Sequence, residues 1–285
     1  MSQATKARLG LVTISLIWGS TFPLTKMVLE MIPPYYYLSL RYGIAVLIMF
    51  LCFRETILAS WKRLWTTSIP IGLSVGAGYI FQTAGLERTS ASKAAFYTSL
   101  SVILVPLIEA ICLKKRLTRR DVWCVLLALG GLALLSGIFK ETPDFNVGDL
   151  LVSGCAIVFA FQIILLDRLP QDCPRQVVVT QQFLVAIALC LPLGAALEKL
   201  PEQRLPADIW GMILFLALIA TALAFTIMAW AQKHLSAQST ALILILEPVF
   251  AALFSWAWLG ETLGGPGVIG ALLILCSLVI SSLHG

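Results

Sequence analysis

Long apolar stretches separated by short polar segments run through the whole chain. Each stretch is about 20 residues long, the length that an α-helix needs to cross the roughly 30 Å hydrocarbon core of a bilayer. Lipid offers no partner to an unpaired backbone N–H or C=O group, so an apolar stretch of this length must be helical. The pattern predicts ten transmembrane helices, over residues 8–29, 36–53, 65–86, 93–114, 121–139, 148–166, 177–197, 208–231, 237–259 and 264–283.

The connections between these stretches are too short to hold a soluble domain, and prolines such as Pro33, Pro143 and Pro170 break several of them. The sequence therefore predicts an all-α integral membrane protein. Basic residues precede the first apolar stretch, as they do in a signal peptide. However, the stretch continues through Trp18 to spanning length and no small-residue cleavage site follows, so we expect an uncleaved first helix.

Composition supports the same class and excludes others. Apolar residues make up 59% of the chain and charged residues 12%, against roughly 45 to 50% and about 25% in soluble domains. The chain has two histidines and seven cysteines without C-x-x-C spacing, which favours neither a metal site nor a Ser-His-Asp arrangement. A net charge of +5 is too small to indicate a nucleic-acid partner. We expect no cofactor, no metal, no nucleic acid and no enzymatic activity.

The charged side chains are divided unequally between the two sides of the predicted helices. If the N-terminus is cytoplasmic, the inner side carries 13 Lys and Arg against four Asp and Glu, and the outer side carries six against nine. Cytoplasmic loops hold the excess of positive charge in membrane proteins. With ten helices, both termini are then expected in the cytoplasm. Three charged residues are assigned to neither side and are expected to be buried in the spans, namely Arg41, Glu109 and Glu247.

The chain contains a weak internal repeat. Shifting residues 90–137 by 146 positions gives 13 identities in 48 pairs. The clearest difference is that Lys114-Lys115-Arg116 lies opposite Gly260-Glu261-Thr262. Five helices per unit place these segments on opposite faces of the membrane, and only the inner one is basic, as expected for two units of inverted topology. We therefore predict two five-helix units, residues 8–139 and 148–283.

Several motifs resemble the EamA branch of the drug/metabolite transporter superfamily. In the first unit they are Trp18-Gly19-Ser20-x-Phe22 with Lys26, Arg41-Tyr42, and Gln82-Thr83-Ala84-Gly85-Leu86 running into Thr89-Ser90-Ala91-Ser92 and Ala94-Ala95-Phe96. In the second unit they are Glu247-Pro248-Val249-Phe250 and Leu259-Gly260-Glu261. The sequence departs from the family pattern at Phe159, where the repeat has Trp, and at Lys114-Lys115, where the first unit has Gly-Glu.

This resemblance covers nearly the whole chain. It implies ten helices in two inverted repeats around a central cavity, with both termini cytoplasmic. It also implies a secondary transporter in the plasma membrane, the inner membrane of a bacterium, and often an exporter of amino acids or related metabolites. The motifs identify the family but do not name a substrate.

Two side chains near the bilayer midplane are the leading candidates for a transport site. Glu247 lies about midway between Ala237 and Leu259, and a charged group at such a depth costs about 2.5 to 3.5 kcal/mol on insertion scales. It could bind a proton or a substrate ammonium group, or it could be a protonated carboxyl group that bonds a neighbouring helix. Trp18, at mid-depth in the first helix, could line a cavity or simply pack.

Lys26 and Arg41 lie near the outer ends of the first two helices. Either could extend to the interface, and Arg41 could simply brace the second helix. Alternatively, either could receive a substrate carboxylate when the cavity faces outward. Further polar groups within the spans are helix contacts or cavity residues: Tyr79, Gln82, Tyr97, Ser101 and Gln162. Pro23, Pro106 and Pro248 each leave a carbonyl unpaired one turn earlier, so we predict helix bending there.

These observations favour a secondary transporter that exports amino acids or related small metabolites by alternating access. Its partners would be a small-molecule substrate and the lipid bilayer, with proton coupling left open. A proton-coupled multidrug transporter, or a transporter of nucleobase- or sugar-type metabolites, is the alternative. An integral membrane enzyme is less favoured because the chain lacks clustered His, Asp or Cys, and a channel is less favoured because no filter loop lies between the spans.

Overall fold

The computed structural model describes residues 2–113, 119–135, 145–200, 204–235, 237–244 and 246–282, and within them every regular element is helical. The elements are α1 (Gln3–Leu29), α2 (Pro34–Ser60), α3 (Trp65–Leu86), α4 (Ala91–Ser99), α5 (Ser101–Leu113), α6 (Arg119–Leu135), α7 (Val147–Asp167), α8 (Arg175–Leu197), α9 (Ala207–Ala217), the π-helix η1 (Leu218–Leu223), α10 (Ala224–Ala231), α11 (Ala237–Leu244), α12 (Leu246–Leu259) and α13 (Gly265–Ser282). The all-α prediction is confirmed.

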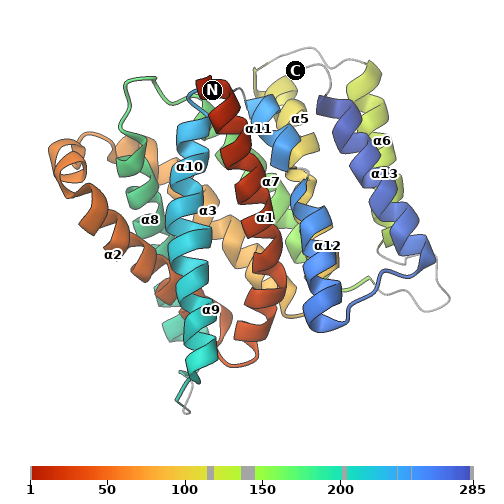
Figure 1. Cartoon of the computed structure of the whole chain (residues 1–285), viewed down its shortest axis with the longest axis horizontal. Helices are drawn as coiled ribbons and strands as arrows, with labels where there is room; N and C mark the ends of the chain where they lie inside the picture. The colour runs from red at the N-terminus through yellow and green to blue at the C-terminus, as the bar shows by residue number, and fades with distance from the viewer. Residues whose placement is uncertain are drawn as a thin grey trace.

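The helices correspond to the ten predicted spans. Seven of them are long and apolar enough to cross a membrane, and shorter apolar helices cover residues 122–135, 246–259 and 265–277. The spans form one upright bundle, and the start of α1 and the end of α13 lie at the same end of it (Figure 1). This placement agrees with an even number of crossings. The predicted unit ends at residues 139 and 283, and the Lys114-Lys115-Arg116 cluster, lie outside the described residues.

Local geometry differs from the sequence expectation at three places. α2 continues past residue 53 to Ser60, with a kink at Phe53 (φ −125°, ψ 25°). The predicted span 93–114 is interrupted at Leu100, which separates α4 from α5. The span 208–231 contains the π-helix η1 in its middle. Polar Arg54 and Glu55 ended the apolar pattern but did not stop the helix, because a helix can leave the hydrocarbon layer without unwinding.

The prolines do not mark these irregular points. α1 runs without a break through Pro23, and Pro248 is the third residue of α12. Pro106 lies in α5, six residues after the interruption, and its side chain is outside the described part of the structure. Helix bending at these prolines therefore stays a prediction.

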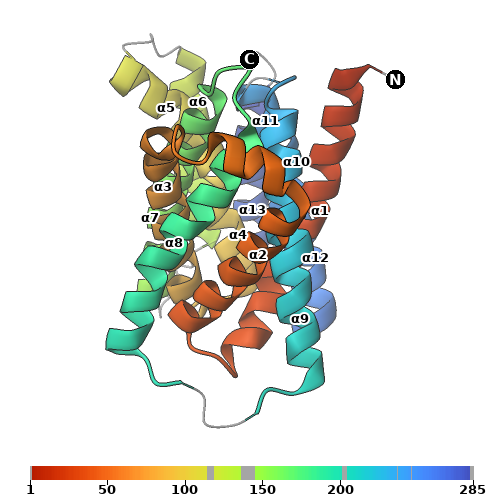
Figure 2. The same cartoon turned by 90° about the vertical axis from the view of Figure 1, so that its left-hand side faces the viewer.

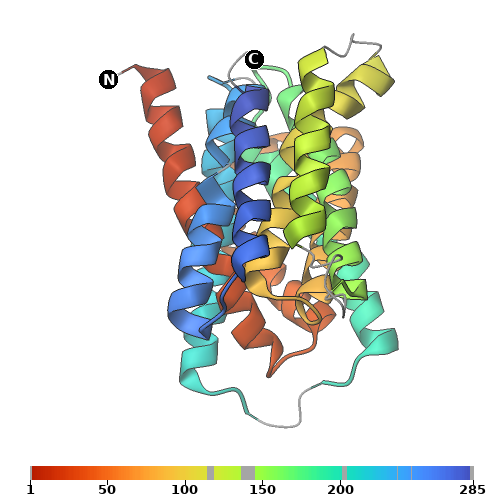
Figure 3. The same cartoon turned by 90° about the vertical axis from the view of Figure 1, so that its right-hand side faces the viewer.

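Pairs of distant helices form the bundle. α3 packs against α7 and α8, α2 packs against α8, and α1 packs against α12 and α10. α2 crosses α8 on one side (Figure 2), and α6 stands beside α13 at the opposite edge (Figure 3). Buried apolar side chains form separate clusters, one around Leu11 and Ile164 and another around Tyr37 and Phe183. Trp18 packs against both clusters, which places it between them.

Candidate functional site

A cavity of about 60 Å³ lies between the helices, with room for a few water molecules. Most of the lining residues form six pairs that are three positions apart in the sequence, and four of these pairs each lie on one helix, which places both side chains on one helix face. The pairs are Trp18 and Thr21, Tyr79 and Gln82, Thr98 and Ser101, Phe159 and Gln162, Phe225 and Met228, and Leu244 and Glu247, with Ser99 and Ile163 completing the wall. The pair Thr98 and Ser101 spans the interruption at Leu100, from α4 to α5.

Six of the residues singled out in the sequence meet in this cavity, namely Trp18, Tyr79, Gln82, Ser101, Gln162 and Glu247. Lys26, Arg41 and Tyr97 do not line it. Tyr97 is fully buried and packs in a cluster with Phe22. The sequence did not single out Thr21, Thr98 or Leu244, although each lies three residues from a named neighbour. Met228 lies three residues from Phe225, which the sequence did not single out either.

The side chain of Trp18 contacts the π-helix η1 and the helix that follows it. Its indole Nε1 donates a hydrogen bond to the carbonyl oxygen of Ala220 at 2.9 Å, and its ring lies 5.3 Å from the ring of Phe225. A π-helix shifts the carbonyl pattern by one residue, and such segments are frequent at functional sites. The arrangement holds the tryptophan ring at the cavity wall through a bond to the backbone.

The same π-helix binds Arg41 through Thr221. The Thr221 hydroxyl donates to the carbonyl of Leu216 at 2.7 Å and accepts from Arg41 Nε at 2.6 Å. Arg41 Nη1 donates to the hydroxyl of Tyr37 at 3.2 Å. Only 2% of Arg41 is exposed, so the expectation that its side chain extends to a membrane interface is wrong. Sequence depth shows how far a residue lies along a span but not which way it faces.

Among the described residues that line the cavity, Glu247 is the only charged one. No hydrogen bond or ion pair to its carboxyl group occurs within the described residues. One turn earlier, the carbonyl of Ile243 accepts a hydrogen bond from Ser15 Oγ at 3.1 Å, which ties α1 to α11. α1 and α12 also meet closely at Gly19, whose Cα lies against the backbone of residues 247–251. The carboxyl group therefore lies where α1 and α12 pack closely, and its oxygens accept no hydrogen bond from the described residues.

The other polar groups of the cavity are neutral. Gln82 Nε2 donates to Thr98 Oγ1 at 3.1 Å, and Thr98 Oγ1 lies 3.5 Å from the sulfur of Cys155. The buried Gln162 Nε2 has no hydrogen-bond partner among the described residues. Free donors and a free carboxyl group beside aromatic rings are suited to hold a small polar solute with an apolar part.

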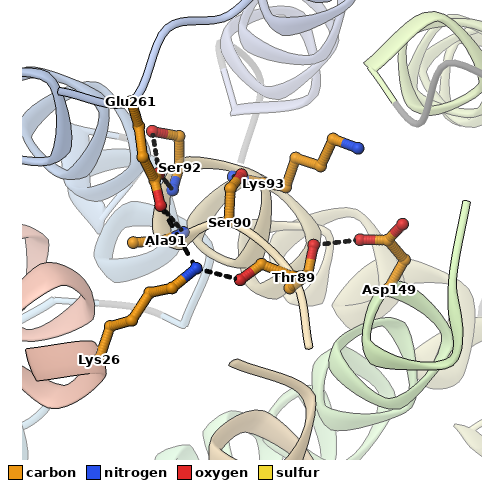
Figure 4. A network of polar contacts seen from close by, with 8 residues as sticks. All are labelled: Lys26, Thr89, Ser90, Ala91, Ser92, Lys93, Asp149 and Glu261. Carbon is orange, nitrogen blue, oxygen red and sulfur yellow. Dashed lines mark hydrogen bonds and ion pairs between the residues drawn. The ribbon is translucent and has the colours of Figure 1, made fainter. Parts of the chain in front are cut away.

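Lys26 takes part in a separate network at the end of the bundle opposite the chain termini (Figure 4). Its Nζ donates to the carbonyl of Thr89 at 2.6 Å and lies 3.4 Å from Glu261 Oε1. Glu261 also accepts from the backbone N–H groups of Ala91 at 2.9 Å and Ser92 at 3.0 Å, and from the Ser92 hydroxyl at 3.1 Å. We call these five residues the α4 network. It joins α1, the start of α4 and the end of α12.

Gly260 explains how Glu261 reaches α4. Its φ of +65° is left-handed, which glycine adopts without strain, and it ends α12. The N–H groups of Gly260 and Glu261 donate back to the carbonyls of Trp256 and Ser255 at 3.2 Å each. The turn brings the carboxylate to the N-terminus of α4, where the helix dipole favours negative charge.

Two further contacts at this end join the two halves of the chain. The carboxylate of Glu198, at the end of α8, accepts from the backbone N–H groups of Tyr35 at 2.9 Å and Tyr36 at 3.0 Å in the first turn of α2. The Thr89 hydroxyl donates to Asp149 in the first turn of α7 (Figure 4). Carboxylates of the second half therefore occupy the N-terminal turns of α2 and α4.

The model of the EamA-like transporter family matches residues 5–137 and 146–283. An uncharacterized transporter of Archaeoglobus fulgidus is 36% identical, over 98% of this chain and 86% of the relative. The biotin transporter of Escherichia coli is 25% identical, over 94% and 90%. The S-adenosylmethionine/S-adenosylhomocysteine transporter of Chlamydia trachomatis is 25% identical, over 92% and 85%.

A solved crystal structure shares the fold, with a TM-score of 0.73 over 98% of this chain and 97% of the other, at 19% identity. This likeness supports the helical architecture described above. The two family matches and the relative at 36% identity cover nearly the entire sequence. The chain therefore belongs to the EamA-like transporter family, and it is a multi-pass membrane transporter.

Proposed function

We propose that the protein is a secondary active transporter that exports amino acids or related small metabolites by alternating access. The observation that carries this proposal is the cavity at mid-depth, which is lined from both halves of the chain and contains the carboxyl group of Glu247, without a hydrogen-bond or ion-pair partner among the described residues. A site at mid-depth between two halves can be exposed to either side by a relative motion of those halves. Proton coupling through Glu247 is part of this proposal.

We also propose that residues 8–139 and 148–283 are inverted five-helix units. The helix contacts support this because they recur with the two halves exchanged. α3, in the third span of the first unit, packs against α7, the first helix of the second unit. In the same way, α10, in the third span of the second unit, packs against α1, the first helix of the first unit. The predicted side that holds both chain termini carries the excess of positive charge, which supports a cytoplasmic position for both termini in the inner (plasma) membrane of a bacterium.

The decisive experiment is uptake by proteoliposomes that contain the purified protein. Radiolabelled amino acids, nucleobases, biotin, S-adenosylmethionine and cationic drugs would be supplied singly, with and without a pH gradient. We expect flux of one or more amino acids that responds to the gradient. Flux of cationic drugs alone would support the multidrug alternative and refute the amino-acid proposal, and flux of biotin or nucleobases alone would move the assignment to those metabolites.

The α4 network is proposed to hold the outer end of the bundle closed. Glu261→Gln removes the negative charge that four donors share, and a hydrogen bond to a charged group contributes about 1.5 to 3 kcal/mol. The side chains of Lys26 and Glu261 are 30% and 17% exposed, so water screens part of this energy. We expect about a tenfold shift toward the outward-open state, equivalent to about 1.4 kcal/mol.

Labelling measures this shift. A cysteine at Thr21, in a chain whose seven native cysteines are replaced, would react about tenfold faster with a membrane-impermeant maleimide added outside intact cells. Glu87→Gln, which changes an acid at the same end of the bundle but outside the network, is the control and should leave the labelling rate unchanged. Equal rates in the two variants would refute the closing role, and reaction only after permeabilisation would reverse the proposed orientation.

A further inference from the structure

Arg41 is a buried cation without a buried anion. Only 2% of it is exposed, and no carboxylate pairs with it within the described residues, where the one ion pair is that of Lys26 with Glu261. Its Nε and Nη1 donate to the hydroxyl groups of Thr221 and Tyr37, and its Nη2 has no hydrogen-bond partner among the described residues. The positively charged guanidinium group is therefore hydrogen-bonded to two neutral hydroxyl oxygens, and its Nη2 donates to neither of them.

This arrangement is costly for a residue that only braces α2. A guanidinium group stays protonated in proteins, so Arg41 cannot lose its charge to escape the cost of burial. Arg175, also buried, likewise has one nitrogen, Nε, without a hydrogen-bond partner among the described residues. It differs in its partners, because its Nη atoms donate to the backbone carbonyls of Leu166 and Leu169 at 3.3 Å each at the end of α7, as expected for a bracing arginine. Arg41 is instead bound by a side chain of the π-helix that also holds Trp18.

Arg41 lies directly behind the cavity wall. Its Cζ is 5.1 Å from the centre of the Tyr79 ring, and Tyr79 lines the cavity while Arg41 does not. The Tyr79 ring also contacts Phe159, another wall residue, at 5.2 Å between ring centres. Tyr79 thus contacts both the guanidinium group and the cavity, and a change of its rotamer would move the wall side chain that lies over Arg41.

We propose that Arg41 is the carboxylate subsite of the transported solute and that Tyr79 covers it in the conformation described here. The inference rests on the proposed function and specifies the substrate class: a small solute with both a carboxylate and an ammonium group, received by Arg41 and Glu247. Lys26 is excluded from this role because it belongs to the α4 network. The planar fork of arginine binds both oxygens of a carboxylate, and the unused Nη2 supplies one of the two donors.

The test compares an amino acid with its amide, which keeps the ammonium group and the side chain but lacks the carboxylate. The radiolabelled amino acid that the wild-type protein transports best would be taken up by proteoliposomes in the presence of unlabelled acid or amide. For the wild type we expect the acid to compete at least tenfold better than the amide. In Arg41→Gln this ratio should fall to about one, and Arg41→Lys should restore part of it.

Arg175→Gln is the matched control, since it removes a buried arginine elsewhere in the fold and should leave the ratio at its wild-type value. If Arg41→Gln does not fold, Tyr79→Ala decides the question, because uncovering Arg41 should let acetate inhibit uptake at a concentration at least tenfold lower than in the wild type. A wild-type ratio retained in Arg41→Gln, or unchanged acetate inhibition in Tyr79→Ala, refutes the subsite alone. Absence of amino-acid transport by the wild type refutes the proposed function, and the inference falls with it.

Discussion

Glu247→Gln is expected to lower the rate of transport at least tenfold and to abolish its response to a pH gradient. The glutamine amide keeps the size of the side chain but can neither carry a proton through the cycle nor form a charged pair with a substrate ammonium group, an interaction of about 1.5 to 3 kcal/mol. Among the residues that the structure describes, no second charged residue lines the cavity and could replace it. The measurement is the initial rate of uptake by proteoliposomes at equal protein content, at several pH values on each side.

Glu109→Gln provides the control for this experiment. Glu109 is also an acid within a predicted span, but it lies in α5 and outside the residues that line the cavity. This variant should transport at the wild-type rate with the wild-type pH response. If Glu247→Gln matched it in both respects, Glu247 would be a structural carboxyl group and the coupling part of the proposal would be wrong.

Gly19→Ala is expected to abolish transport and lower the melting temperature by several degrees. An added Cβ would lie 2.5 Å from Phe250 Cβ, 2.9 Å from the backbone nitrogen of Ala251 and 3.0 Å from the carbonyl oxygen of Glu247. Two of these atoms belong to the backbone of α12, so α1 and α12 must separate. Overpacking of this kind costs about 1 to 3 kcal/mol, and it displaces both Trp18 and Glu247 from the cavity wall.

Gly154→Ala is the matched control because nothing lies within 4 Å of the position that its Cβ would occupy. Alanine favours the helix by about 0.5 to 1 kcal/mol over glycine, so this variant should melt at the wild-type temperature or slightly above it and should transport normally. The melting temperatures can be followed by fluorescence-detected size exclusion after heating in detergent. Equal melting temperatures and rates for both variants would show that α1 and α12 do not need close contact at Gly19.

The fold could be predicted because the bilayer restricts the alternatives so strongly. Each apolar stretch had to be a helix, and the ten predicted spans recur in the structure. The departures from regular α-helix inside the spans could not be predicted from the sequence. The segment Leu218–Leu223 contains no glycine or proline, yet it forms the π-helix whose backbone and Thr221 hydroxyl bind Trp18 and Arg41. That register is set by contacts with other helices, which local sequence does not report.

The candidate site was predictable in depth but not in direction. Glu247 and Trp18 were selected because they lie at mid-depth, and both line the cavity. Lys26 and Arg41 were placed alike at the outer helix ends, but one joins a network with Glu261, 235 residues away in the chain, and the other is buried against the π-helix. A single sequence gives the position of a residue along its helix, whereas the facing direction of isolated polar residues depends on how the helices pack.

The carboxylates of Glu198 and Glu261 also constrain how the protein is made. They cap the first turns of α2 and α4, but a ribosome synthesises them more than 160 residues after the groups that they cap. The early helices therefore enter the membrane before these carboxylates exist, and their backbone donors receive these partners only when the late helices arrive. The contacts between the two halves are therefore completed near the end of translation. A chain truncated before residue 198 lacks both of the carboxylates that bind the first turns of α2 and α4.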